Sequence, residues 1–134
     1  MITTESAIHP GWWMVPYERF EAWKMAHQLA LRVYKVTESW PVSERYGLTI
    51  QIRRAALSAP TNIAEGSAKR GSRELRRYLD IALGSLSEVS YLLRFTRDRG
   101  VLSEVDFKTL DDLRDQAGKL TWRFYSSLSR SIAP

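Results

Sequence analysis

The chain has 134 residues, a length that favours one domain with its own core over two. Twenty Lys and Arg residues against fifteen Asp and Glu residues give a formal net charge of +5, which permits an acidic partner such as nucleic acid without requiring one. The sequence excludes disulfides and thiolate metal sites because it has no cysteine, and it contains no run of about eighteen apolar residues that would predict a membrane span.

We expect three segments: an N-terminal arm at residues 1–16, a helical bundle at 17–130 and a C-terminal tail at 131–134. The arm lacks the pattern of a secretory signal, so a cytoplasmic location is the expectation. Trp12 and Trp13 are unusual in such an arm. They either fold back onto the bundle or dock on a neighbouring subunit.

The first helix is expected from about Glu18 to Ser39, because Pro16 lies just before it and Trp40-Pro41 ends it. Two adjacent apolar stripes recur at three- and four-residue steps along it, and together they make a wider apolar face than a surface helix needs. The stripes are Phe20, Trp23, His27, Ala30, Tyr34 and Thr37, and Ala22, Ala26, Leu29, Val33 and Val36.

The second helix is expected to begin after an N-cap at Ser43 and to reach about Ala68. Pro60 lies inside it and removes the backbone hydrogen bond to the carbonyl of Ala56, a loss of about 3 kcal/mol where nothing relieves it. We therefore expect the helix to be distorted near Pro60, with hydroxyls at Ser58 and Thr61 satisfying some of the freed backbone.

Asn62 and Glu65 are three residues apart and so share a face of the second helix. Since the two residues between them look buried, we expect one of the two polar groups to make a hydrogen bond to another helix. A catalytic carboxylate is the less favoured interpretation, because no histidine or second activated group is evident nearby.

The third helix is expected from Arg73 to about Arg99, capped by Ser72 and stopped by Gly100. It also carries two apolar stripes, the first made of Leu75, Leu79, Ala82, Leu86, Val89 and Leu93 and the second of Tyr78, Ile81, Ser85, Leu92 and Phe95. Ser103 should cap the fourth helix in a capping-box-like pair with Asp106. Four long helices with short connections predict an all-α fold, an up-down-up-down, left-handed four-helix bundle.

A di-metal site of the kind found in helical bundles needs Glu-x-x-His motifs. His9 lies in the arm, and Lys24 stands three residues before His27, so the motif is absent. We predict no metal, no cofactor and no catalytic residue. Small residues around Gly84 and Ser85 are expected to permit close helix approach rather than to cradle a phosphate.

Two stretches, YGLTIQIRRAALSAPTNIAEGSAKR and YLDIALGSLSEVSYLL, resemble the bacterial four-helix bundle family of 23S ribosomal RNA intervening-sequence proteins. The resemblance covers roughly Phe20 to Leu128. Ala59 departs from it, since the family usually has isoleucine there, and the N-terminal arm lies outside it. The positions that match the family signature are Pro60, Asn62, Glu65, Gly66, Gly84, Ser85 and Glu88.

This resemblance implies a fold and an assembly more than an activity. It implies a homopentamer with a central channel and a basic surface, as relatives look to be. Some relatives are encoded inside ribosomal RNA intervening sequences. A related branch comprises accessory proteins of diversity-generating retroelements, which bind a reverse transcriptase and nucleic acid. The family has no established catalytic residue, so the resemblance assigns none.

Five cations stand against one acid, Glu74, near the start of the third helix: Lys69, Arg70, Arg73, Arg76 and Arg77. Cations there oppose the helix dipole at about 0.3–1 kcal/mol each, whereas those at the other end of that helix complement it. The cluster is either a solvated face, with Arg76 paired to Asp80, or a surface that contacts phosphate. In an oligomer each cluster is repeated, so weak contacts add.

Arg53 and Arg54 match the Arg-Arg pair of the family signature. Because their neighbours are apolar, one of them should extend from a largely buried face. Pairing with a carboxylate of another subunit and contact with nucleic acid are both open for it.

The leading functional prediction is a non-enzymatic, oligomeric helical bundle that binds RNA or DNA weakly and without sequence specificity. The alternative is a protein-interaction scaffold or accessory subunit with no direct nucleic-acid role. Specificity has no basis in the sequence, which shows no aromatic-rich RNA platform and no DNA-reading motif.

Overall fold

The computed structural model describes the backbone of residues 15–132 and the side chains of residues 15–128. Trp12 and Trp13 lie outside the described residues, so their predicted contacts stay open. Within the described residues, no helix combines the length and apolar character needed to cross a membrane.

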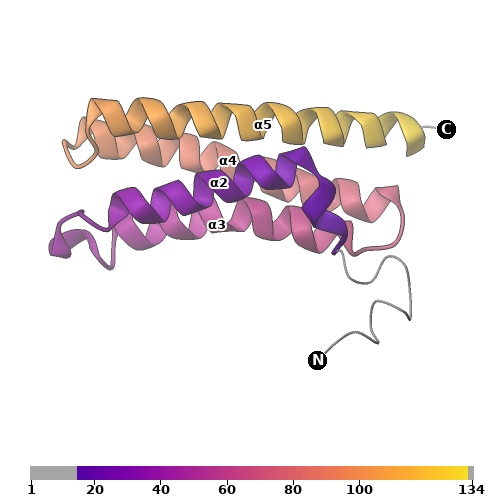
Figure 1. The fold of residues 1–134 in the computed structure, drawn as a ribbon, viewed down its shortest axis with the longest axis horizontal. Coiled ribbons are helices and arrows are strands. Elements are labelled where there is room, and N and C mark those ends of the chain that lie inside the picture. Colours follow the sequence, from indigo (N-terminus) through magenta and orange to yellow (C-terminus); the bar gives the residue numbers. More distant parts are fainter. Residues whose placement is uncertain (1–14, 133–134) are drawn as a thin grey trace.

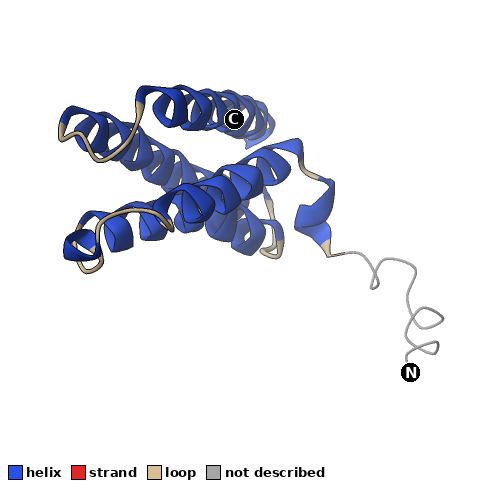
Figure 2. Ribbon diagram, turned by 60° about the vertical axis from the view of Figure 1, so that its left-hand side comes forward, coloured by secondary structure: helices blue, strands red, loops and turns tan. Residues whose placement is uncertain are grey.

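Helices make up almost all of the described chain, and residues 15–132 contain no strand (Figure 2). In chain order the elements are η1 (Pro16–Arg19), α2 (Glu21–Thr37), η2 (Val42–Glu44), α3 (Leu48–Ser67), α4 (Ser72–Asp98) and α5 (Glu104–Ile132). The prediction of an all-α protein with four long helices is therefore confirmed.

The four long helices lie lengthwise beside one another (Figure 1). Helix α3 packs against α2 and α4, and α5 packs against α4 and α2, so each long helix contacts two others around a shared core. The loops that join α2 to α3 and α4 to α5 lie at one end of the molecule, and the α3–α4 loop lies at the other.

Each long helix contributes large side chains to this core. Fully buried examples are Leu29 from α2, Ile52 from α3, Leu93 from α4 and Leu110 from α5. Burying one such side chain stabilises the fold by about 1.5–3 kcal/mol. Buried alanines lie between these residues and bring the helix backbones close together.

The two apolar stripes predicted on the first and third helices divide between the core and the surface. On α2 the stripe that includes Ala26 and Leu29 is largely buried, whereas Tyr34 of the other stripe is exposed. On α4 the second stripe leaves Ile81 and Phe95 exposed. The predicted surplus of apolar surface is thus present on the described chain.

Two helix starts differ from the predictions. Helix α2 begins at Glu21 rather than Glu18, because Pro16–Arg19 form a 3-10 turn and Phe20 is extended. Ser43 does not cap the second helix; it lies in η2, and α3 begins at Leu48 after Gly47. The prediction failed because a serine is a good N-cap by residue type, but here the serine lies in the short 3-10 helix that precedes α3.

The connections around α4 agree more closely with the predictions. Helix α4 begins at Ser72, one residue earlier than predicted, and its N-cap is Gly71 at φ 84°; the predicted cap by Ser72 is therefore wrong, since no side-chain cap hydrogen bond forms there. The helix ends where predicted, ahead of Gly100 at φ 79°, a left-handed conformation that favours glycine. The hydroxyl of Ser103 accepts a hydrogen bond from the Asp106 backbone N–H at 3.1 Å, which confirms the predicted cap of α5.

Helix α3 continues through Pro60 without interruption, and the proline is buried. Side chains donate to carbonyls near it: the Thr61 hydroxyl donates to the Leu57 carbonyl at 2.7 Å, which is not the Ala56 carbonyl that Pro60 leaves without its usual partner. The amide of Asn62 donates to the Ser58 carbonyl at 2.9 Å. A bend of this continuous helix at Pro60 stays a prediction.

Candidate nucleic-acid interface

A basic cluster surrounds the turn between α3 and α4. It consists of Lys69, Arg70, Arg73, Arg76 and Arg77. Two of these residues lie in the turn itself and three in the first two turns of α4. Arg76 is half-buried, and the other four are exposed. The fold therefore brings the predicted cations to one end of the molecule.

Tyr78 anchors part of this cluster against the end of α3. The Lys69 ammonium lies 5.5 Å from its ring centre, and the Arg77 guanidinium lies 4.6 Å from it. Gly66 makes the close approach of α3 to α4 possible here, since a Cβ on it would stand 2.7 Å from the Tyr78 Cβ. This contact explains why a glycine is needed at this position of the family signature.

Arg77 forms the cluster's one ion pair among the described residues, at 3.3 Å from Glu74. The hydrogen bond to Glu74, together with its negative charge, raises the pKa of Arg77. No ion pair joins Arg76 to Asp80 in the described structure, so that pairing is not formed. Arg76 instead lies over the ring of Tyr125, 4.8 Å from its centre.

A shallow hollow of about 390 Å³ opens beside the cluster, between α4 and α5. Its lining residues are Arg73, Glu74, Arg76, Arg77, Asp80 and Tyr125. Three guanidinium groups thus share it with two carboxylates. The side-chain Nε of Arg76 is buried and has no hydrogen-bond partner among the described residues, so the hollow carries an unsatisfied donor.

Aromatic residues on α5 beside this hollow escaped the prediction from sequence. Trp122 stacks on Tyr125, with ring centres 5.5 Å apart and planes 24° apart. The available signal was their spacing of three residues, which places both on one face of a helix. The contact of Tyr125 with Arg76 depends on how α4 and α5 pack together.

Arg53 and Arg54 separate into two environments. Arg53 is held by the C-terminal turn of α2, where its Nε donates to the Thr37 hydroxyl at 2.8 Å and an Nη donates to the Tyr34 carbonyl at 3.3 Å. Its guanidinium also lies 4.6 Å from the Tyr34 ring centre. Arg54 is exposed. Of the two, only Arg54 presents its charge freely to a partner.

The polar signature residues form a network different from the one predicted. The hydroxyls of Ser58 and Ser85 lie 2.7 Å apart and join α3 to α4. Asn62 supports Ser58 from within α3, at 3.1 Å from its hydroxyl. Glu65 is exposed and makes no such contact with a described residue, and Asn62 bonds only within α3, so the predicted hydrogen bond from one of these two residues to another helix is wrong. Glu88 is exposed as well.

Gly84 does not serve close approach within the chain, contrary to prediction. It is exposed, and a Cβ built on it would meet no atom of the described residues within 4 Å. Helical glycine costs about 1 kcal/mol relative to alanine. The packing of the described residues gives no reason for this glycine.

No group of three or more His, Cys, Asp or Glu side chains that could hold a metal ion occurs among the described residues. His27 stacks against Trp23, with ring centres 4.8 Å apart. The residues that the structure gathers are cations and aromatic rings at one end of a bundle.

These features define a helical-bundle protein with a basic end. A sequence model of the 23S rRNA-intervening sequence protein family matches residues 18–123, and the chain belongs to that family. A search of curated proteins found no match.

Proposed function

We propose that this protein is a non-enzymatic homo-oligomer that binds RNA or DNA weakly, without sequence specificity, through the basic cluster. The observation that carries the proposal is the exposure of four of the cluster's five cations at one end of the bundle. In this proposal the protein is cytoplasmic, and each subunit is an up-down-up-down, left-handed bundle.

The charges of the cluster are poorly compensated within the chain. None of Lys69, Arg70 and Arg73 forms an ion pair with another described residue, and the Lys69 ammonium lies over the ring of Tyr78. Cations in the first turns of α4 also oppose its dipole. Phosphate groups would relieve both effects, and their contacts need no base readout.

Oligomerisation is supported by apolar side chains on the outer faces of α3 and α4. Exposed examples are Ile50 and Leu57 on α3 and Ile81, Tyr91 and Phe95 on α4. Gly84 adds open space beside them, where another subunit's side chains would pack. Five subunits are proposed from the family resemblance, and a ring would repeat the basic cluster around its axis.

The family's name refers to the intervening sequences of 23S rRNA and names no binding partner, so the proposal of a nucleic-acid partner rests on the basic cluster. The alternative is a scaffold or accessory subunit for another protein, such as a reverse transcriptase in the related branch. The same exposed apolar side chains favour that alternative, because large apolar patches mark protein interfaces.

The test is a titration of the purified protein with RNA across salt concentrations, with its mass in solution measured by light scattering. We expect a mass several times that of the chain. We also expect the logarithm of affinity to fall linearly with the logarithm of salt. A monomer would contradict the assembly, and no binding at about 50 mM salt would favour the scaffold.

A further inference from the structure

The aromatic pair on α5 extends the basic cluster into a continuous stack. Arg76 of α4 lies on one side of the Tyr125 ring, and Trp122 packs against the same tyrosine. Together the two rings place a broad aromatic surface next to the hollow that the cluster lines.

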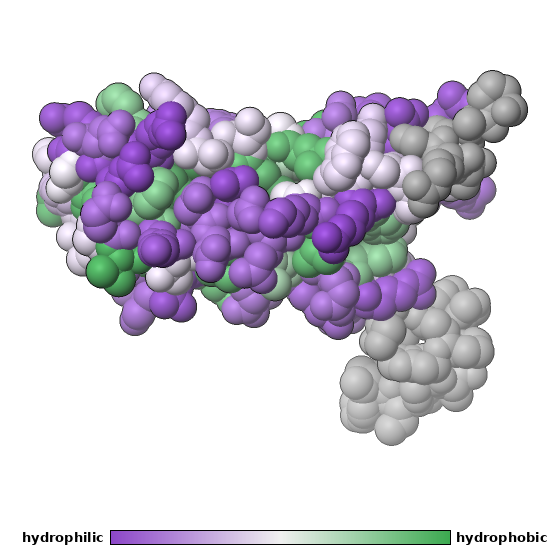
Figure 3. All heavy atoms as spheres, turned by 90° about the horizontal axis from the view of Figure 1, so that it is seen from above, coloured by the Kyte–Doolittle hydropathy of each residue, from purple (hydrophilic) through white to green (hydrophobic). Residues whose placement is uncertain are grey.

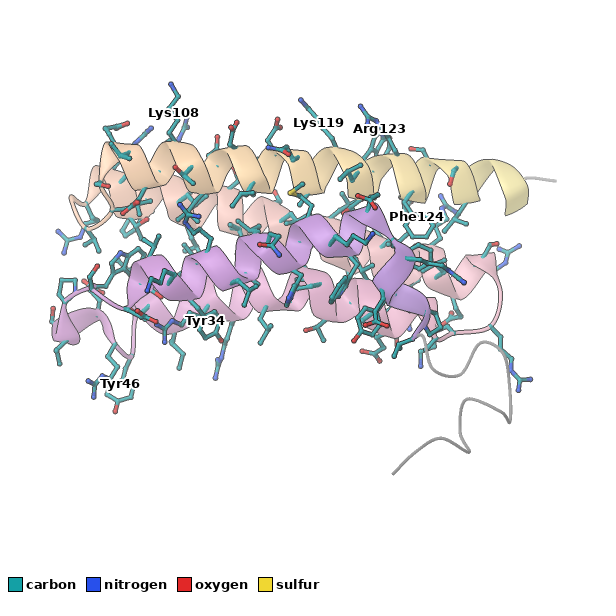
Figure 4. The ribbon with its side chains drawn as sticks, in the orientation of Figure 1. Tyr34, Tyr46, Lys108, Lys119, Arg123 and Phe124 are labelled. Atoms are coloured by element: carbon teal, nitrogen blue, oxygen red, sulfur yellow. The ribbon has the colours of Figure 1, made fainter. Side chains whose placement is uncertain are left out.

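Trp122 is not needed to fill the core. Its side chain is 56% exposed, whereas its neighbour Thr121 is fully buried. Phe124 packs inward against Phe20, with ring centres 4.6 Å apart (Figure 4). The other two tryptophans of the described chain are half-buried or buried, so Trp122 alone presents most of its surface to solvent.

Further cations lie near Trp122 on α5. Lys119 and Arg123 extend from the outer side of α5 (Figure 4), three residues before Trp122 and one residue after it. Lys119 is 3.1 Å from Asp115, while Arg123 is exposed. The basic cluster lies across the hollow, and hydrophilic side chains cover most of this face of the molecule (Figure 3).

We propose that Trp122 stacks on an unpaired base of single-stranded nucleic acid. The strand would cross α5 with phosphates at Arg123 on one side and at Arg73, an exposed arginine of the hollow, on the other. This inference rests on the proposed function and adds a preference for single strands.

Chemistry favours a single strand over a duplex here. A base in a duplex is already stacked between its neighbours, whereas an unpaired base can splay onto a protein ring. Every base has a π-face, so such a contact tolerates any sequence. Arg76 and Tyr125 are the half-buried residues of the hollow, whereas Arg73, Glu74, Arg77 and Asp80 around it are exposed, so a phosphate has exposed arginines to bind while the base lies against the ring.

The test compares Trp122→Leu with the parent protein on an oligouridylate, an oligodeoxythymidylate and an RNA duplex of equal length. Loss of one stacked base should weaken binding of the single strands about 5- to 150-fold and change duplex binding less than about twofold. Trp122→Phe should retain most of the affinity. An effect confined to one of the two oligonucleotides would identify the strand as RNA or DNA and support the inference.

Tyr46→Leu is the matched control, because Tyr46 is 84% exposed and lies at the opposite end of the molecule (Figure 4). It should leave binding unchanged. Circular dichroism would verify that each variant is folded. If Trp122→Leu binds single strands as the parent does, the stacking inference is overturned and the proposed function stands. A parent protein that binds no nucleic acid overturns the proposed function itself.

Discussion

The hydroxyl of Ser58 in α3 lies 2.7 Å from the hydroxyl of Ser85 in α4. These serines belong to the two separate stretches of the family signature, so their hydrogen bond joins the two stretches across α3 and α4. Asn62 adds a second partner, since its amide donates to both the carbonyl and the hydroxyl of Ser58.

We expect Ser85→Ala to lower the free energy of unfolding by about 0.5–1.5 kcal/mol, because it removes the partner of Ser58 on α4. Glu65→Ala should change it by less than about 0.5 kcal/mol, as is usual for an exposed side chain. Urea unfolding of the two variants measures both effects. A larger decrease for Glu65→Ala would mean that Glu65 has a partner in another subunit.

Two signature glycines should respond oppositely to alanine. Gly66→Ala places a Cβ 2.7 Å from the Tyr78 Cβ, and overpacking of this kind typically costs about 1–3 kcal/mol. Gly84→Ala meets no atom within 4 Å, and the helix propensity of alanine should stabilise the isolated chain by about 0.5–1 kcal/mol. Thermal unfolding at equal protein concentration compares the two.

Gly84→Ala also tests the proposed assembly. If another subunit packs over Gly84, the added methyl group should weaken the oligomer while leaving the fold of each subunit intact. Light scattering over a dilution series would detect this as a shift toward smaller species. An unchanged mass at every concentration would place the subunit interface elsewhere.

Substitutions of the two neighbouring arginines of α3, Arg53 and Arg54, should differ in their effect on stability. Arg53→Gln should lower the free energy of unfolding by about 1–3 kcal/mol, since the Thr37 hydroxyl and the Tyr34 carbonyl lose a charged donor. Arg54→Gln should leave stability nearly unchanged. Chemical unfolding and RNA titration of both variants check this. Equal destabilisation would contradict the assignment of different environments.

The four long helices, the end of α4 at Gly100 and the start of α5 at Ser103 were predictable from the sequence, because apolar periodicity and capping residues act locally. The core-facing stripe of α2 was also visible in its spacing. The second apolar stripe of α4 was visible in the same way. Which of its residues remain exposed, Phe95 among them, depends on how the helices pack and could not be predicted from spacing.

The candidate interface was only half predictable. A run of cations is evident in the sequence, but Arg53 and Arg54 look alike there and differ only once α2 packs beside α3. The contact of Arg76 with Tyr125 joins residues far apart in the chain, so spacing within one helix could not reveal it. The hydrogen bond to another helix was expected from Asn62 or Glu65, but Ser58 makes it, because the burial of Ile63 between them does not bring either polar side chain to α4.

The most direct test of the central claim is the salt dependence of RNA binding by a variant in which Lys69, Arg70, Arg73 and Arg77 are changed to glutamine. Arg94→Gln and Arg97→Gln provide controls from the other end of α4. Arg97 packs 4.1 Å from the Phe107 ring centre and lies near Asp98 and Glu104, so its removal should cost stability and little binding.

We predict that the fourfold variant binds RNA more weakly at low salt and that its salt slope is flatter by about 0.7–0.9 for each phosphate that the cluster no longer binds. Its stability should be unchanged or slightly higher, since these cations oppose the dipole of α4. An unchanged slope, or an equal decrease of affinity in the control variants, would contradict the assignment of phosphate binding to the basic cluster.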